Sequence, residues 1–140
     1  MRKRGAIGGI ILAGVCLSGA AAGVRYEVPA VEGDATEVLQ RVIDAAVAGG
    51  AGAEIRLAPG ATYHVYRTSA TPKLRYITNT TSERENPDNT KYIALYMQGA
   101  EGLTLDGNGA KIVTHGELTS FAIEQGAGVT LKNFTLDAAD

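Results

Sequence analysis

The chain contains two similar stretches whose matching residues lie 26 or 27 positions apart. Residues 94–108 read ALYMQGAEGLTLDGN, and residues 121–133 read FAIEQGAGVTLKN. Both contain QGA, beginning at Gln98 and Gln125, and both follow it with an LTL or VTL tripeptide. A repeat of this length predicts a solenoid, in which each turn of chain buries an apolar stripe against its neighbours. Each copy holds short strand-like segments separated by Gly and Asn, so the sequence predicts an all-β fold, the right-handed parallel β-helix.

The sequence DGNG at residues 106–109 contains two turn signals that usually indicate a β-hairpin, because Asp-Gly and Asn-Gly tolerate positive φ angles. In a hairpin, Leu105 and Ile112 would pair with each other. In a solenoid they would pair with the coils above and below. The repeat therefore predicts a corner of one coil at this position.

An amphipathic helix is predicted near the start of the chain, in the sequence DATEVLQRVIDAAVAGG. Asp34 or Thr36 can cap it, and Gly49-Gly50 ends it. Its apolar residues recur at steps of three and four: Val38, Leu39, Val42, Ile43, Ala46 and Val47. We expect this helix to cover the open end of the first coil, which would otherwise expose unpaired backbone and apolar side chains.

After the helix, alternating residues predict short strands with one buried face. Ile55 and Leu57 mark one strand, Tyr63 and Val65 mark the next, and Pro59-Gly60 forms the turn between them. Residues 69–91, SATPKLRYITNTTSERENPDNTK, are polar and irregular and predict an exposed excursion from the core. The last residues, LKNFTLDAAD, stop within a coil, so we expect the chain to be the N-terminal part of a longer protein or the product of a truncated reading frame.

The N-terminus has the three parts of a secretory signal peptide. Arg2-Lys3-Arg4 is positively charged, residues 6–17 are apolar, and small residues follow at 20–22. The predicted cleavage lies between Ala22 and Gly23, which divides the chain into a signal at 1–22, an extended segment at 23–34 and the β-helix region at 35–140. The apolar run is too short to span a bilayer, so no membrane span is expected after cleavage. A lipoprotein site at Cys16 is the less favoured alternative, and the predicted location is secreted or periplasmic.

Charge and cysteine content narrow the function classes. The formal net charge is −2 from 13 basic and 15 acidic residues, and three of the basic residues lie in the signal. An acidic chain without a basic stripe is a poor nucleic-acid binder, so no nucleic-acid partner is expected. Cys16 is the only cysteine, which leaves the exported segment without a disulfide or thiol chemistry. No cofactor is predicted.

Few residues in the chain indicate chemistry. His115 precedes Gly116 at a strand end and is the candidate substrate-binding residue, because it could project from a coil corner toward a sugar hydroxyl. His64 reads as the polar neighbour of a buried pair. The DGNGA sequence after Leu105 lacks the oxygen ligand and the glycine that a calcium loop requires, so no metal site is predicted. Asp106 is expected to close an Asx turn instead.

Three further polar residues have two readings each. Asp137 and Asp140 form a terminal carboxylate pair, the residue type that glycoside hydrolysis uses, but such a pair can equally be solvated. Asn133 lies in an Asn-Phe-Thr glycosylation pattern, or stacks in an asparagine ladder inside the solenoid.

The sequence ATEVLQRVIDAAVAGGAGAEIRLAPGATYHV resembles the opening of pectate-lyase-superfamily β-helix enzymes. The combination of TYHVY, RYITN, LTLDGNGAKIVTHG and SFAIEQGAGVTLKNFTLD resembles glycoside hydrolase family 110, the bacterial α-1,3-galactosidases, from about Ala35 to Asp137. The resemblance implies an exported enzyme that releases terminal α-1,3-linked galactose from glycans with inversion. It places the catalytic carboxylates on later coils, beyond Asp140, so no catalytic residue is assigned and the 140-residue chain alone is expected to be inactive.

Two other functions remain open. A polysaccharide lyase or polygalacturonase of the same superfamily would need calcium-binding aspartates and an arginine or lysine base. A non-catalytic β-helix, such as a surface protein that binds glycans, would bind sugar without turnover.

Overall fold

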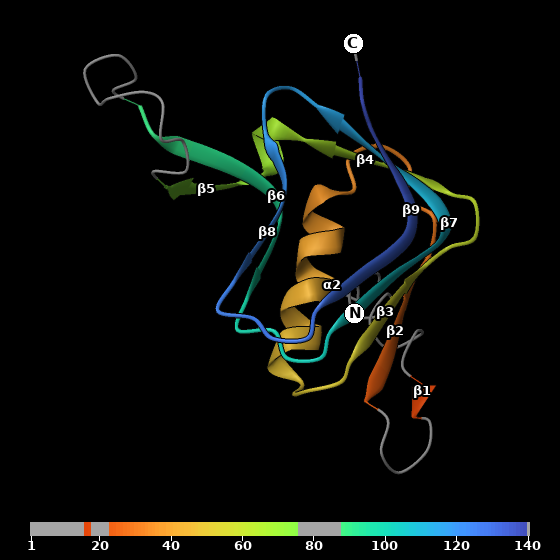
Figure 1. Cartoon of the computed structure of the whole chain (residues 1–140). Coiled ribbons are helices and arrows are strands. Elements are labelled where there is room, and N and C mark those ends of the chain that lie inside the picture. The colour runs from red at the N-terminus through yellow and green to blue at the C-terminus, as the bar shows by residue number, and fades with distance from the viewer. Residues whose placement is uncertain (1–15, 18–22, 76–87, 140) are drawn as a thin grey trace, which may run out of the picture.

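The computed structural model describes residues 16–17, 23–75 and 88–139 (Figure 1). Strands predominate, and the described part of the chain contains a single α-helix. The elements in chain order are β1 (Cys16–Leu17), β2 (Val24–Val28), α2 (Thr36–Ala48), β3 (Glu54–Leu57), β4 (Thr62–Tyr66), the 3-10 helix η1 (Arg67–Ser69), β5 (Thr71–Leu74), β6 (Thr90–Gln98), β7 (Thr104–His115), β8 (Thr119–Glu124) and β9 (Thr130–Ala138).

Parallel strands from successive coils stack directly on one another. In the first column β2, β3, the start of β7 and the start of β9 lie in that order, and Ile55, Leu105 and Leu131 are register partners. Ile55 and Leu105 are buried. Because side chains alternate between the two faces of a strand, each pairing places aliphatic side chains in one shared core. The predicted all-β solenoid is confirmed.

The two repeated stretches lie on top of each other, as the repeat predicted. Thr104 pairs with Thr130, and the Thr130 amide donates to the Leu103 carbonyl oxygen at 2.8 Å. The next column repeats this arrangement in β6 and β8, where Leu95 pairs in parallel with Phe121. The coils therefore share a column of apolar residues.

β7 turns a corner at residues 107–109 and does not form a hairpin. Leu105 pairs with Ile55 and Leu131, whereas Ile112 pairs with Tyr63 on β4 and Leu136 on β9. Asn108 has φ 54°, so the chain turns there through a left-handed conformation. One strand thus continues from the first column of the solenoid into a different column, which is formed by β4, the end of β7 and the end of β9.

The exposed excursion predicted at residues 69–91 is partly regular. Thr71–Leu74 forms β5, which pairs antiparallel with the start of β6. No alternating pattern marks this strand in the sequence, because β5 is short and its residues are only half-buried or exposed. The rest of the polar run, residues 76–87, lies outside the described residues.

Helix α2 covers the end of the first coil. Figure 1 shows it between the sheet of β6 and β8 and the sheet of β3, β7 and β9, and it contacts β2, β3, β4 and β6. Its buried face is formed by Thr36, Leu39, Val42, Ile43 and Ala46. Of the predicted face, Val38 and Val47 are only half-buried.

Polar groups of the helix region also satisfy the free backbone edge of the first coil. The Ala35 amide donates to the His64 carbonyl oxygen at 2.7 Å, and the Tyr66 amide donates to Thr36 Oγ1 at 2.8 Å. The Gln40 side chain bonds both backbone groups of Tyr96 on β6, with each distance 2.8 Å. The upper edge of the solenoid is therefore both covered and hydrogen-bonded, which removes a template for pairing with another chain.

At the opposite end, large apolar side chains face solvent. Ile123 is 42% exposed and Leu136 is 46% exposed. Among the described residues, no helix has the length and apolarity needed to cross a membrane. The predicted signal and its cleavage point at Ala22 and Gly23 lie almost entirely outside the described residues, so that prediction stays untested.

Candidate functional site

His115, the predicted substrate-binding residue, lies at the end of β7 and is half-buried. Its Nε2 is 2.8 Å from Nδ1 of His64 on the neighbouring coil, so one of these ring nitrogens donates a hydrogen bond and the other accepts it. Its ring stacks on Tyr66, with centroids 4.2 Å apart and planes 10° apart. His64 is therefore not only a polar neighbour of buried residues, because it joins two coils.

Asp34 is the centre of a second cluster of polar contacts, between the start of α2 and η1. Its Oδ1 accepts from the Thr36 amide at 2.9 Å and from Thr36 Oγ1 at 2.6 Å, while Oδ2 accepts from Ser69 Oγ at 2.5 Å. Burial raises the pKa of Asp34, but the hydrogen bonds from Ser69 and Thr36 outweigh it, and the net pKa is lowered. These bonds fasten the start of α2 to η1. The cap predicted at Asp34 or Thr36 is not formed, because Ala35 occupies the N-cap position and no side chain makes a capping hydrogen bond there. Asp34, one residue earlier, binds the Thr36 amide instead.

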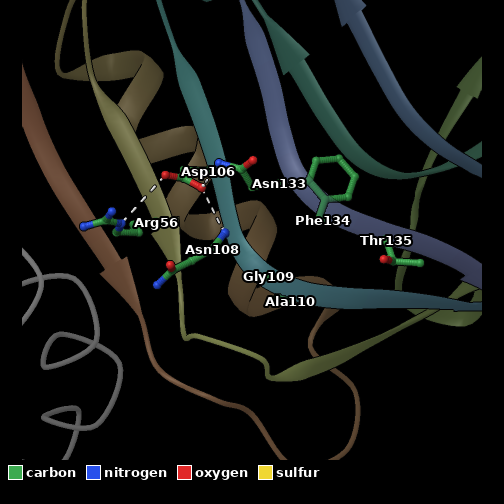
Figure 2. Close-up of a pocket in the computed structure, with 8 residues that line it drawn as sticks. All are labelled: Arg56, Asp106, Asn108, Gly109, Ala110, Asn133, Phe134 and Thr135. Atoms are coloured by element: carbon green, nitrogen blue, oxygen red, sulfur yellow. Dashed lines mark hydrogen bonds and ion pairs between the residues drawn. The ribbon is translucent and has the colours of Figure 1, made fainter.

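A third polar cluster forms where β7 turns its corner (Figure 2). Asp106 Oδ1 accepts a hydrogen bond from the Asn108 amide at 2.9 Å, as the Asx-turn prediction requires, and a second from Asn133 Nδ2 at 3.0 Å. Asp106 Oδ2 lies 3.8 Å from Arg56 Nε on the coil above. Figure 2 shows the Asp106 carboxylate between the arginine on one side and the two asparagines on the other.

The electrostatics of Asp106 favour its charged form. Its side chain is 8% exposed, and burial alone would raise its pKa. The hydrogen bond from Asn133 and the one from the Asn108 amide have the opposite effect, and the positive charges of Lys132 and Arg56 add to it. The pKa of Asp106 is consequently lowered, so the carboxylate is ionised at neutral pH.

The cluster borders an open cavity of about 500 Å³, here named the Asp106 cavity. It is lined by Arg56, Asp106, Asn108, Gly109, Ala110, Asn133, Phe134 and Thr135. Within the part of the chain that the structure describes, the guanidinium of Arg56 makes no hydrogen bond, and its Nε is buried. Such a wall offers donors and acceptors side by side, which suits recognition of a polar uncharged molecule.

Sequence reasoning missed Arg56 and the role of Asn108. Arg56 occupies an ordinary half-buried position on the outer face of EIRL, and nothing local marks it. Its proximity to Asp106 follows from the register that pairs these two residues across coils 50 positions apart in sequence. To predict this contact from the sequence, one would have to align two coils of different sequence to the exact residue. The asparagine ladder predicted at Asn133 is not formed, because Asn133 is exposed and its side-chain amide donates to Asp106 of the previous coil.

The other predicted candidates are not assembled into a site. Asp137 is exposed on β9, and its Oδ1 accepts a hydrogen bond from the Ala138 amide. Asp140 lies outside the described residues, so the terminal carboxylate pair is not tested. Among residues 16–17, 23–75 and 88–139, no group of three or more His, Cys, Asp or Glu could hold a metal ion.

No protein-family model matches the chain. It is 41% identical over 83 residues to alpha-1,3-galactosidase A of Bacteroides thetaiotaomicron, a match that covers 59% of this chain and 14% of that protein. It is 36% identical over 86 residues to alpha-1,3-galactosidase A of Bacteroides fragilis strain YCH46, covering 61% of this chain and 14% of the relative. The corresponding protein of Streptomyces avermitilis is 36% identical over 78 residues, covering 56% and 12%.

These matches support the alpha-1,3-galactosidase family for this chain. The resemblance to alpha-1,3-galactosidases that the sequence motifs indicated is therefore confirmed. The chain spans about 14% of the length of the first two relatives. What these galactosidases share with it is a segment.

Proposed function

We propose that this chain supplies coils of a secreted glycoside hydrolase that removes terminal α-1,3-linked galactose from glycans with inversion. The observation that carries the proposal is the 41% identity over 83 residues to a protein named alpha-1,3-galactosidase A. The parallel solenoid supports it, because stacked strands provide a long rigid outer surface on which a glycan can be bound.

The role of this segment is to begin and stabilise that surface. Helix α2 closes one end of the solenoid, and strands β3, β7 and β9 establish the coil register. Binding and catalytic groups are most precise when a rigid scaffold holds them. A segment that fixes the register therefore contributes to activity without supplying the reacting groups.

The 140-residue chain by itself is expected to lack hydrolytic activity. An inverting glycosidase needs one carboxyl group that stays protonated to act as general acid, and this requires a raised pKa. Within residues 23–75 and 88–139, the carboxyl groups whose pKa departs from the ordinary value all depart downward: Asp34, Asp88, Asp106 and Glu124. Each is held in its charged form by hydrogen bonds, which is the opposite of what proton donation needs.

The proposal is tested by assaying the whole protein on a galactosyl-α-1,3-galactose disaccharide, with the α-1,4- and α-1,6-linked isomers as controls. We expect release of galactose from the α-1,3 isomer, and proton NMR of fresh product should show β-galactose first, because inversion of an α-linkage gives the β-anomer. Absence of galactose release would refute the proposal. Calcium-dependent formation of an unsaturated product from polygalacturonate would replace it with the lyase alternative.

Export is tested separately. Mass spectrometry of the protein recovered from the producing cells should show Gly23 as its first residue. A mature protein that begins with a lipid-modified Cys16 would contradict cleavage after Ala22 and favour a lipoprotein.

A further inference from the structure

We propose that the Asp106 cavity is a binding subsite for one neutral pyranose unit of a glycan. The inference rests on the proposed function only for the choice of galactose as the sugar. The assignment of a neutral polyhydroxylated ligand comes from the residues that line the cavity.

The charges around the cavity select against ions. Among the residues that line the cavity, Arg56 contributes one positive charge and Asp106 one negative charge, and the two groups lie 3.8 Å apart at the closest atoms. Lys132, the register partner of Asp106 on β9, adds a positive charge nearby but does not line the cavity. An anion attracted by Arg56 would be repelled by Asp106, and a cation would meet the reverse arrangement. A neutral ligand avoids both penalties.

The hydrogen-bonding groups match hydroxyls. A sugar hydroxyl both donates and accepts, so its best partners are donors and acceptors placed together. Asp106 Oδ2 can only accept, Arg56 can only donate, and the side-chain amides of Asn108 and Asn133 can do both. Because Arg56 Nε is buried, a pyranose hydroxyl would accept from the other N–H groups of the half-exposed Arg56 side chain, and a neighbouring hydroxyl would donate to Asp106 Oδ2.

The cavity wall is rigid before a ligand arrives. Asp106 is 6% exposed as a residue, and its Oδ1 is fixed by two hydrogen bonds while Oδ2 has none within the described residues. Asn108 and Asn133 both have left-handed backbone conformations, with φ 54° and 63°, at the corner where three residues of β7 oppose one of β9. A preorganised polar wall loses little conformational entropy on binding. The volume of about 500 Å³ lies within the range of ~300–1,000 Å³ that is typical of small-molecule sites.

The test uses the full chain and methyl α-D-galactopyranoside as the probe. Two-dimensional NMR should show shifts that saturate with probe concentration at the backbone amides of Asn108 and Gly109 and at the side-chain amide of Asn133. The backbone amide of Val38, on helix α2 and not among the residues that line the cavity, serves as the internal reference and should not shift. Shifts that never saturate, or that centre elsewhere, would overturn the proposal.

Two matched arginine variants separate binding from folding. Arg56→Gln should weaken probe binding about tenfold, because it removes a charge-assisted donor. Arg25→Gln is the control: Arg25 is equally half-exposed on the outer face of the same column, pairs with Glu54, and does not line the cavity. We expect it to bind the probe within about twofold of the parent chain. Equal affinity of Arg56→Gln and the parent, with both folded by circular dichroism, would refute the subsite.

A charged probe tests the reason for neutrality. Galacturonate presents a carboxylate beside the Asp106 carboxylate, and we expect it to bind more weakly than the neutral galactoside. Tighter galacturonate binding would contradict the neutral-ligand assignment. Galactosidase activity of the whole protein with no binding at this cavity would refute only the subsite, whereas saturable Arg56-dependent binding without that activity would refute only the proposed function.

Discussion

Gln40 gives the sharpest test of how the solenoid ends. Its side-chain Nε2 donates to the Tyr96 carbonyl oxygen and its Oε1 accepts from the Tyr96 amide, both at 2.8 Å. This is the pair of bonds that a neighbouring strand would make, supplied here by one side chain of α2. Gln40→Ala removes both bonds and leaves the edge of β6 open at Tyr96. It also removes an exposed hydrogen bond from Gln40 Nε2 to Asp44, which contributes little.

The magnitude follows from the net value of a hydrogen bond, which is about 0.5–1.5 kcal/mol. Two bonds give about 1–3 kcal/mol, and because Tyr96 is only half-buried, water can partly replace the lost partners. We therefore expect Gln40→Ala to lower the free energy of unfolding by about 1–2 kcal/mol. Gln40→Glu should destabilise at least as much as Gln40→Ala, because a carboxylate oxygen in place of Nε2 would face the Tyr96 carbonyl oxygen and the Asp44 carboxylate.

The assay is urea denaturation of the full chain combined with hydrogen exchange at the Tyr96 amide. Glu37→Ala, on the exposed face of the first helical turn, is the control and should change stability by less than about 0.5 kcal/mol. Faster exchange at Tyr96 in Gln40→Ala, beyond that expected from the global loss of stability, would show local opening of the edge. Unchanged stability and unchanged Tyr96 exchange would refute the reasoning that Gln40 replaces a strand.

Three other perturbations test the packing and the charges. Leu105→Ala, at a position 2% exposed between two coils, should destabilise the chain by about 2–5 kcal/mol in the same urea assay. Gly107→Ala should lower the free energy of unfolding by about 1–3 kcal/mol, because the added Cβ would overlap the Phe134 side chain and lie 2.6 Å from the Asn133 carbonyl oxygen. An unchanged melting temperature would contradict this contact. The hydrogen bond from Arg75 lowers the pKa of Glu124 to about 2, so its stabilising contribution is present above the ordinary glutamate pKa and is lost as pH falls from about 4.5 toward 2. Glu124→Gln should therefore flatten the acid limb of a stability-against-pH curve over that interval, and an unaltered curve would contradict the assignment.

The sequence predicted the features that repeat or follow a period. The spacing of QGA indicated stacked coils, the three- and four-residue steps indicated α2, and alternation located β3 and β4. These signals are visible because burial of one face imposes the same constraint on every coil or turn of helix. The corner at residues 106–109 needed the repeat as well, since its local signal is also that of a hairpin.

The contacts that make up the candidate sites could not be read in the same way. The Gln40 bonds to Tyr96 join a helix surface position to a strand 56 residues away, and neither residue type marks an edge. The pairing of His64 with His115 joins side chains 51 residues apart and depends on the two coils being in register. Contacts of this kind depend on the position of one coil relative to the next, to within one residue, and the aliphatic pattern does not supply that.

Charged residues supply part of the information that sets the register between neighbouring coils. On the outer face of the first column, register partners alternate in sign through Glu27, Arg56, Asp106 and Lys132. Sliding β2 by two residues would keep every aliphatic side chain in the core, because side chains alternate with a period of two. It would, however, place Glu27 opposite Glu54, and like charges directly opposite each other destabilise a strand pair. The aliphatic residues thus fix which face is buried, while the outer charges disfavour the slipped register. Asp106 contributes to the register and to the candidate site. Its position opposite Arg56 and Lys132 disfavours the slipped register, and the same position places it in the wall of the Asp106 cavity.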